Sequence, residues 1–266
     1  MKRIQLFEFE DFEWLPTWMR TAMTNVIVVL HGLLGIPDVL SKLVAQALQQ
    51  SGQKKIVDMG SGSGGAMPAV MEKLAQDEAT KDVEILLTDL YPNPEFIEKF
   101  NQDQSDQISY STDSLDATNL SQAPEGLKTM VNSFHHMPPD KAKGILQTAH
   151  DNKQPLLIYE MAENNIPTVA WWIFLPLGLV IVFVMALFLT PFSKPTPKQL
   201  LFTYLIPIIP IFYAWDGQAS LPRMYTFDDI DQLLEGLEDE GYRWEKGQAL
   251  KEDGKPLGYY VMGMPA

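Results

Sequence analysis

Short apolar runs alternate with amphipathic helical patterns between residues 55 and 160. This alternation is typical of a parallel sheet whose strands are joined by helices on both faces. The predicted strands are Lys55–Met59, Val83–Thr88, Gln107–Ser111, Thr129–Ser133 and Pro155–Glu160. The predicted helices are Ala66–Gln76, Asn93–Asp103 and Pro139–Asp151.

The C-terminal part of the chain has a different pattern. Tyr225–Asp239 predicts an acidic amphipathic helix. Its apolar face is formed by Ile230, Leu233, Leu234 and Leu237. The last residues, YRWEKGQALKEDGKPLGYYVMGMP, contain two strand-like pieces around a polar turn and therefore predict a β-hairpin.

Residues 1–50 predict helices rather than strands. Pro16 is suited to open a helix, because proline is tolerated at the first helical position. The apolar segment Met23–Val44 is expected to break at Gly35-Ile36-Pro37 and to continue as a helix from Asp38. We expect this part either to cap the sheet or to touch lipid or an apolar acceptor.

Two long uncharged runs interrupt the pattern after Glu160. Ile166–Thr190 has 25 residues without a charge, and Gln199–Trp215 forms the second run. About 20 apolar residues are enough to cross a bilayer as a helix, so the two runs predict an apolar helical hairpin. Full crossing would carry Lys194 and Lys198 to the far side, against the bias that keeps basic loops cytoplasmic. A hairpin that dips into the membrane is favoured, and a buried lid or a homo-oligomer interface are the alternatives.

Charge and composition exclude several classes of function. The chain has 266 residues, a net charge of -14 and no cysteine. A strongly acidic protein argues against a nucleic-acid partner, and without cysteine there is no disulfide, thiolate metal site or cysteine nucleophile. No clustered metal-ligand spacing is present, so no metal is expected. The acidic start is unlike a secretory signal, and we expect the catalytic part on the cytoplasmic side.

The glycine-rich segment at the end of the first predicted strand, DMGSGSGG, has the strand–turn–helix pattern of a nucleotide-binding cradle, and a glycine turn without a ligand is the alternative. Gly60, Gly62 and Gly65 satisfy the fingerprint of dinucleotide binders. The same segment also has an acid followed by alternating glycines: Asp58, Gly60, Gly62 and Gly64. A carboxylate at the strand end repels a pyrophosphate but attracts the ammonium and sulfonium of S-adenosylmethionine. In this pattern the sequence resembles the class I S-adenosylmethionine-dependent methyltransferases.

The resemblance covers about residues 50–162 and 220–266 and implies the fold and the cofactor site. The expected fold is a Rossmann-like, mainly parallel sheet of about seven strands with helices on both faces, a C-terminal antiparallel strand and the inserted apolar hairpin. Asp89, at the end of the second strand, is expected to accept both ribose hydroxyls. Asp116 is expected to read the adenine amino group, with Asp113 as a competitor. The expected cofactor-binding residues are Asp58, Gly60, Ser61, Gly62, Gly64, Asp89, Leu90, Asp116, Ala117 and Asn132.

Three residues are the catalytic candidates. His135, the favoured member of a histidine pair with His136, follows the fourth strand and is suited to take a proton. Adjacent residues at a strand end should face opposite sides, so one histidine is expected to point into the site. Glu160, at the end of the fifth strand, would act as a base or orient a nucleophile, or else pair with an arginine. Asp216 lies in a predicted Trp-Asp-Gly turn, with Trp215 and Arg223 as further acceptor-side candidates.

These expectations give four parts and one main function. The parts are an N-terminal helical cap (1–50), a cofactor-binding core (51–165), an apolar hairpin (166–215) and a C-terminal completion of the core (216–266). The predicted function is methyl transfer from S-adenosylmethionine to a lipophilic or membrane-borne small molecule, at the cytoplasmic face of a membrane. The alternatives are an NAD-dependent oxidoreductase and a non-catalytic, membrane-anchored cofactor-binding module.

Overall fold

The computed structural model describes residues 1–102 and 107–266, and their contacts divide into two compact units. Unit 1 contains Met1–Leu34 and Glu163–Thr226. Unit 2 contains Gly35–Ala162 and Phe227–Ala266. The unit boundaries therefore follow Leu34, Ala162 and Thr226, and the predicted four-part division stays a prediction.

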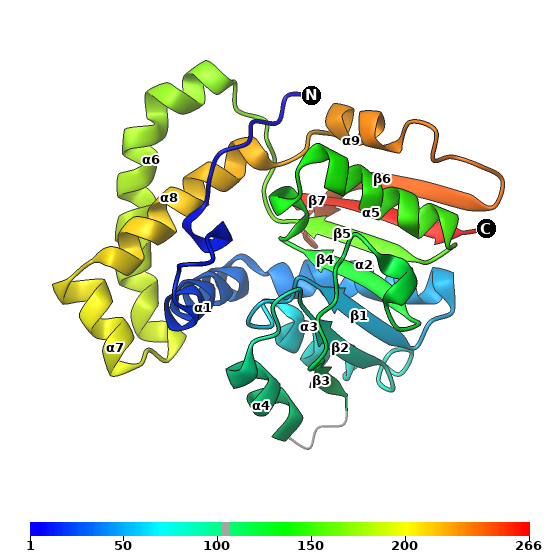
Figure 1. The fold of residues 1–266 in the computed structure, drawn as a ribbon, viewed down its shortest axis with the longest axis horizontal. Coiled ribbons are helices and arrows are strands. Elements are labelled where there is room, and N and C mark those ends of the chain that lie inside the picture. Colours follow the sequence, from blue (N-terminus) through cyan, green and yellow to red (C-terminus); the bar gives the residue numbers. More distant parts are fainter. Residues whose placement is uncertain (103–106) are drawn as a thin grey trace. The chain divides into compact units, whose positions relative to one another are not determined.

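Unit 2 is built on a seven-stranded sheet in the order β3-β2-β1-β4-β5-β7-β6 (Figure 1). β1 to β5 are parallel, and β7 joins β5 and β6 in antiparallel pairs. The strands are β1 (Lys55–Met59), β2 (Glu84–Thr88), β3 (Ile108–Tyr110), β4 (Leu127–Val131), β5 (Leu156–Glu160), β6 (Tyr242–Leu250) and β7 (Pro256–Pro265). The predicted sheet, its hairpin and its antiparallel C-terminal strand are confirmed.

Helices cover both faces of the sheet in unit 2. α2 lies on one face and α5 on the other (Figure 1). α2 packs on α3, and α5 packs on α9. The helices are α2 (Ile36–Ser51), α3 (Met67–Leu74), α4 (Pro94–Gln102), α5 (Pro139–Asp151) and α9 (Phe227–Leu234), with 3-10 turns η2 (Leu120–Gln122) and η3 (Phe134–His136). Of the predicted helix Asn93–Asp103, Asp103 lies outside the described residues.

The C-terminal helix is shorter than predicted. α9 ends at Leu234, because Gly236 takes a left-handed conformation with φ of 80° that ends helices readily. Its predicted apolar face is nevertheless buried, from Ile230 to Leu237. The break at Gly35 is confirmed: Gly35 has φ of 81° and α2 begins at Ile36, with Pro37 in its first turn.

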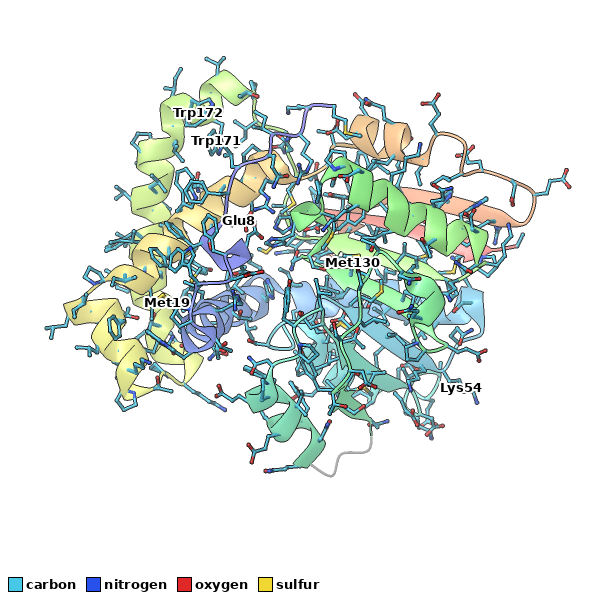
Figure 2. All side chains as sticks on the ribbon, in the orientation of Figure 1. Glu8, Met19, Lys54, Met130, Trp171 and Trp172 are labelled. Atoms are coloured by element: carbon cyan, nitrogen blue, oxygen red, sulfur yellow. The ribbon has the colours of Figure 1, made fainter. Side chains whose placement is uncertain are left out.

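Unit 1 is helical. Its elements are η1 (Phe9–Asp11), α1 (Thr17–Leu34), α6 (Thr168–Leu189), η4 (Thr190–Ser193), α7 (Pro197–Leu200), a π-helical turn (Leu201–Leu205) and α8 (Ile208–Arg223). α1, α6 and α8 enclose one apolar cluster. Its buried members include Met19 and Met23 of α1, Ala186 of α6, and Ile209 and Tyr213 of α8 (Met19 in Figure 2).

The predicted apolar hairpin corresponds to α6 and α8. α6 packs against α8, and together with η4 it is long and apolar enough to cross a membrane, judged by length and composition alone. α7, the π-helical turn and α8 pass the same test together but are bent by 78° at the break between them. One face of α6 is open: of its two tryptophans, Trp171 is buried and Trp172 exposed (Figure 2).

We predict that Leu157→Ala in β5 lowers the free energy of unfolding by about 2–5 kcal/mol, the usual loss for a buried leucine. Leu157 is fully buried between β4 and β7, which pair with β5 on its two sides. Urea denaturation checks this. The matched control is Leu250→Ala in the same unit, where the exposed side chain should change stability by less than about 0.5 kcal/mol. Equal losses in both variants would contradict the position of β5.

Candidate functional site: a glycine loop among strand-end carboxylates

The loop between β1 and α3 is held open by glycines. Gly60, Gly62 and Gly64 have φ of 67°, 53° and 94°, a region that residues with a side chain rarely adopt. A Cβ at Gly64 would lie 2.9 Å from Cζ of Phe100, so this glycine also lets the loop pack on α4. A Cβ at Gly62 would meet no described atom within 4 Å. The loop thus presents bare backbone to open space at Gly62, as a cofactor cradle requires.

Asp58 is the buried anchor of this loop. Its Oδ2 accepts a hydrogen bond of 2.6 Å from Oγ of Ser61, in the loop, and its Oδ1 accepts one of 2.7 Å from Oγ1 of Thr129, in β4. The backbone oxygen of Asp58 accepts a further bond from Oγ1 of Thr88, in β2. One residue therefore connects three neighbouring strand ends. Because Asp58 is buried, it acts by positioning the loop and by its charge.

The environment of Asp58 changes its acidity. Burial raises the pKa of its carboxyl to about 6, and the negative charge of Asp89 adds to this, while hydrogen bonds from Ser61 and Thr129 lower the pKa. The burial contribution dominates because a carboxylate removed from water loses hydration that two hydroxyl donors replace only in part. At neutral pH the group still carries its charge.

Asp89 closes the other side of the loop. Its Oδ2 accepts a hydrogen bond of 2.9 Å from the backbone N–H of Gly62, and its Oδ1 accepts one of 2.8 Å from that of Tyr91. Tyr110 of β3 donates its hydroxyl to the backbone oxygen of Gly62 at 2.8 Å. Leu90, next to Asp89, is exposed. The half-buried Asp89 therefore lies beside the open part of the loop, and its ribose-binding role stays a prediction.

The segment after β3 lies against the segment after β2. The backbone N–H of Leu115 donates to the backbone oxygen of Asp89 at 2.9 Å, and Oγ of Ser114 donates to that of Leu90 at 2.6 Å. Asp116 is exposed, and its Oδ1 accepts hydrogen bonds from the backbone N–H and hydroxyl of Thr118. Ala117 is half-buried beside it. The backbone contacts bring the segment that carries Asp116 against the segment that carries Asp89, and the adenine-binding role of Asp116 stays a prediction.

The segment after β4 completes the group of strand ends. Asn132 has φ of 52°, and its Oδ1 accepts a hydrogen bond of 2.8 Å from the backbone N–H of Met161. A Cβ at Gly60 would lie 3.4 Å from Cβ and Oγ of Ser133, so the two loops are in contact. The predicted cofactor residues thus gather at the C-terminal edge of β1, β2, β3 and β4.

His135 and Glu160 form a buried pair in unit 2. Oε2 of Glu160 lies 2.8 Å from Nδ1 of His135, and Oε1 accepts the backbone N–H of His135 at 2.9 Å. An ionised carboxylate only accepts, so this contact places a proton of the imidazole on Nδ1. Of the roles predicted for Glu160, the geometry matches that of an orienting group.

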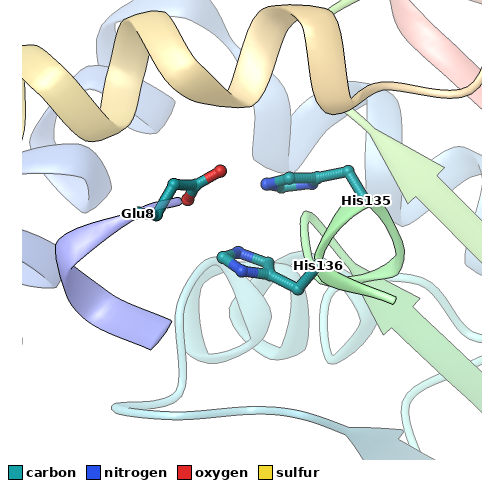
Figure 3. A group of neighbouring side chains, drawn as sticks. All are labelled: Glu8, His135 and His136. Carbon is teal, nitrogen blue, oxygen red and sulfur yellow. The ribbon is translucent and has the colours of Figure 1, made fainter. Parts of the chain in front are cut away.

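One sequence argument about the histidines is wrong. β4 ends at Val131, and His135 and His136 lie in the 3-10 turn η3, so their side chains do not alternate as in a strand. Their rings lie side by side, with centroids 4.3 Å apart and planes inclined by 37° (Figure 3). Both rings therefore lie on the same side of the turn, and the preference for His135 now depends on its contact with Glu160.

The predicted Trp-Asp-Gly turn is also wrong. Asp216 lies within α8, which continues to Arg223, and Gly217 is tolerated there because it packs closely on Val182 of α6. The carboxylate of Asp216 accepts hydrogen bonds from the backbone N–H groups of Phe9 (2.7 Å) and Glu10 (3.2 Å). Asp216 thus accepts the hydrogen bonds of the backbone N–H groups at the start of η1, within unit 1. A catalytic role for Asp216 stays a prediction, as do acceptor-side roles for Trp215 and Arg223.

Sequence reasoning missed two residues of the site. Thr129 binds Asp58, and Tyr110 binds the loop at Gly62. For Thr129, the available signal was a hydroxyl within the strand LKTMV, which lies next to the strand that carries Asp58. Because each pairing depends on strand order, the signal becomes readable only when the sheet is known.

Comparisons with known proteins relate the chain to methyltransferases by fold. No protein-family model and no curated protein match its sequence. The structure of the plantazolicin methyltransferase BpumL, solved with S-adenosylhomocysteine (SAH), matches with a TM-score of 0.55 and 12% identity over 92% of this chain and 89% of that one. An O-methyltransferase family protein from Burkholderia thailandensis matches with a TM-score of 0.56 and 12% identity. That match covers 99% of this chain and 64% of that one. The predicted fold, that of the class I methyltransferases, is confirmed.

We predict a pH-dependent effect of Asp58→Asn on stability. Because the pKa of Asp58 rises from 3.8 to about 6 on folding, protonated Asp58 stabilises the fold at low pH, and this contribution is lost as pH rises through about 6. Asparagine does not titrate, so the variant lacks this pH-dependent contribution to stability. The free energy of unfolding of the wild type should therefore fall relative to the variant by about 2 kcal/mol between pH 4 and pH 7. Urea denaturation at several pH values checks this, and parallel curves for both proteins would contradict it.

Proposed function

We propose that the chain transfers a methyl group from S-adenosylmethionine to a small-molecule acceptor. The observation that carries this proposal is the arrangement of Asp58, Asp89 and Asp116 at neighbouring strand ends around the open glycine loop. Carboxylates placed together repel phosphates and favour a cationic ligand. The methyltransferase fold supports the same choice.

The residues present fit this cofactor. Asp89 offers carboxylate oxygens beside the bare backbone of Gly62, which suits the two donors of a ribose diol. Asp116 is exposed and offers an acceptor for an adenine amino group. The dinucleotide alternative would place a pyrophosphate between these acids without a basic partner from the glycine loop. NAD-dependent oxidation is therefore the less favoured function.

The chemistry needs mainly position and one proton acceptor. S-adenosylmethionine supplies a methyl group on sulfonium, and the acceptor attacks it in line, so that the new bond to carbon forms as the carbon–sulfur bond breaks. The glycine loop and the strand-end acids hold the reactants in place, and such positioning accounts for much of the rate in displacements of this kind. For a hydroxyl acceptor, Nε2 of His135 takes the proton, while Glu160 holds the ring and stabilises the imidazolium.

The acceptor is proposed to be lipophilic and to come from a membrane. In support, α6 exposes many large apolar side chains and is long enough to enter a bilayer. The insert also follows β5 directly in the chain, and β5 ends at Glu160. The same features fit a location at the cytoplasmic face of a membrane. A homo-oligomer through the apolar face and a membrane-anchored module without catalysis are the competing proposals.

We predict that the chain binds S-adenosylhomocysteine and that Asp89→Ala weakens this binding at least tenfold. The variant loses the carboxylate for the ribose and the acceptor for Gly62 N–H, whereas Asp82→Ala, at an exposed acid just before β2 and away from the C-terminal ends of the strands, should change affinity less than twofold. Isothermal titration calorimetry with S-adenosylhomocysteine and NAD checks both. Binding of NAD in preference to S-adenosylhomocysteine would overturn the proposed function.

We predict that His135→Ala lowers methyl transfer about 10²–10⁴-fold, the usual contribution of a proton acceptor, with S-adenosylhomocysteine affinity unchanged within twofold. Glu160→Gln should also lower the rate and shift the pH profile, because the amide offers one acceptor oxygen to the two N–H donors of His135 and no charge to stabilise the imidazolium. Transfer of radiolabel from S-adenosylmethionine to a total lipid extract is the measurement. Unchanged rates in both variants would show that the acceptor is already anionic or that another group takes the proton.

A further inference from the structure

α6 carries one continuous exposed apolar face, here named the apolar stripe. Its members recur at helical spacing along the whole helix, so they lie on one side of it. They are Val169, Ile173, Phe174, Leu177, Val180, Ile181, Val184 and Phe188, all exposed. The opposite side, with Trp171, Leu175, Ala186 and Leu189, is buried. An apolar face of this length marks an interaction surface.

The middle of α6 lies level with polar groups of α8. Gly178 is the eleventh of the 22 residues of α6, and a Cβ there would lie 2.5 Å from Oε1 of Gln218. Gly217 packs on Val182 at the same level. Asp216, next in α8, binds the backbone of Phe9 and Glu10. The segment around η1 is therefore attached to α8 near the midpoint of α6.

This segment carries charges that face water. Asp11 and Glu13 are exposed, and Arg223 of α8 is paired with Glu8 (2.9 Å) and Asp11 (2.6 Å). If α6 crossed a bilayer, Asp11 and Arg223 would lie within the hydrocarbon core, because Arg223 is within about two turns of α8 from the level of the middle of α6, and charged side chains are strongly disfavoured there. The length of α6, about 33 Å for 22 residues, permits crossing, but its neighbours in unit 1 oppose it.

The charged residues of the insert indicate which kind of surface the apolar stripe would bind. Between Glu163 and Asp216 the chain carries two charged residues, Lys194 and Lys198, and both are basic, although the net charge of the whole chain is -14. Both are exposed, in the connection that follows α6, and Nζ of Lys198 lies 3.8 Å from the ring centroid of Trp18. Exposed Phe192 is beside them. Lysines and aromatic rings at the end of an apolar surface are complementary to anionic lipid headgroups.

We propose that unit 1 binds an anionic bilayer from one side, with the apolar stripe lying in a single leaflet and Lys194 and Lys198 among the headgroups. α6 alone is apolar all round, and unit 1 becomes amphipathic because α8 and α1 cover one side of α6. This inference rests on the membrane part of the proposed function. It replaces the predicted hairpin that dips into the membrane by one that lies along the membrane surface.

The lipid selectivity is tested by flotation of the full chain with vesicles of phosphatidylcholine, with and without phosphatidylglycerol. The wild type should float with the anionic vesicles, and Lys194→Gln with Lys198→Gln should weaken this about 30-fold. Lys81→Gln with Lys141→Gln, two exposed lysines of unit 2, is the matched control and should have little effect. Equal binding to neutral vesicles, or a dimer in place of flotation, would overturn the proposal.

The topology is tested with single cysteines, which the cysteine-free chain makes unambiguous. Lys194→Cys and, as reference, Asp253→Cys in the β6–β7 turn are expressed and labelled in sealed membrane vesicles with an impermeant maleimide. Labelling of both from the same side supports surface binding, and labelling from opposite sides overturns it. S-adenosylhomocysteine binding is measured on the same variants. If that binding persists while flotation or topology fails, the membrane inference alone is wrong; if it is absent in a folded wild type, the proposed function is wrong.

Discussion

The double hydrogen bond to the buried carboxylate of Asp58 is the contact on which the arrangement of the site depends. Ser61 supplies one donor from the glycine loop and Thr129 supplies the other from β4, so the loop cannot move independently of the sheet. Burying a carboxylate with only neutral donors is unfavourable, which the raised pKa of Asp58 reflects. The fold thus buries an incompletely solvated carboxylate at the point where the loop must be fixed.

The two units treat charge in opposite ways. Unit 2 gathers acids at one edge of its sheet and satisfies them with hydroxyl and backbone donors. Unit 1 buries Arg223 against Glu8 and Asp11 and leaves many large apolar side chains of α6 exposed. In most soluble proteins charged side chains such as Arg223 are exposed and large apolar side chains are buried, which is the opposite of the arrangement in unit 1.

Much of unit 2 could be predicted because its signals are local. β1 was predicted to the residue, and α5 likewise, since an apolar run, a glycine turn and a proline at a helix start act within a few residues. β4 was predicted two residues late, because a charged residue such as Lys128 is typical of the end of a buried strand. In the structure the side chain of Lys128 is buried, and its Nζ donates hydrogen bonds to the backbone oxygens of Pro124 and Gly126. The pairing of Glu160 with His135, and that of Asp216 with η1, join residues far apart in the sequence. No local pattern encodes such partners.

The antiparallel pairing of β5 with β7 has a consequence for synthesis. The two strands are separated in the chain by the insert and by α9 and β6, so that about 95 residues must follow Glu160 before β7 begins. At roughly 5–20 residues per second, a ribosome needs several seconds for this stretch. During that time β5 presents an unpaired edge while the most apolar part of the chain is emerging. Nascent chains of this protein therefore pass through an interval in which a chaperone or an early membrane contact would protect them from aggregation.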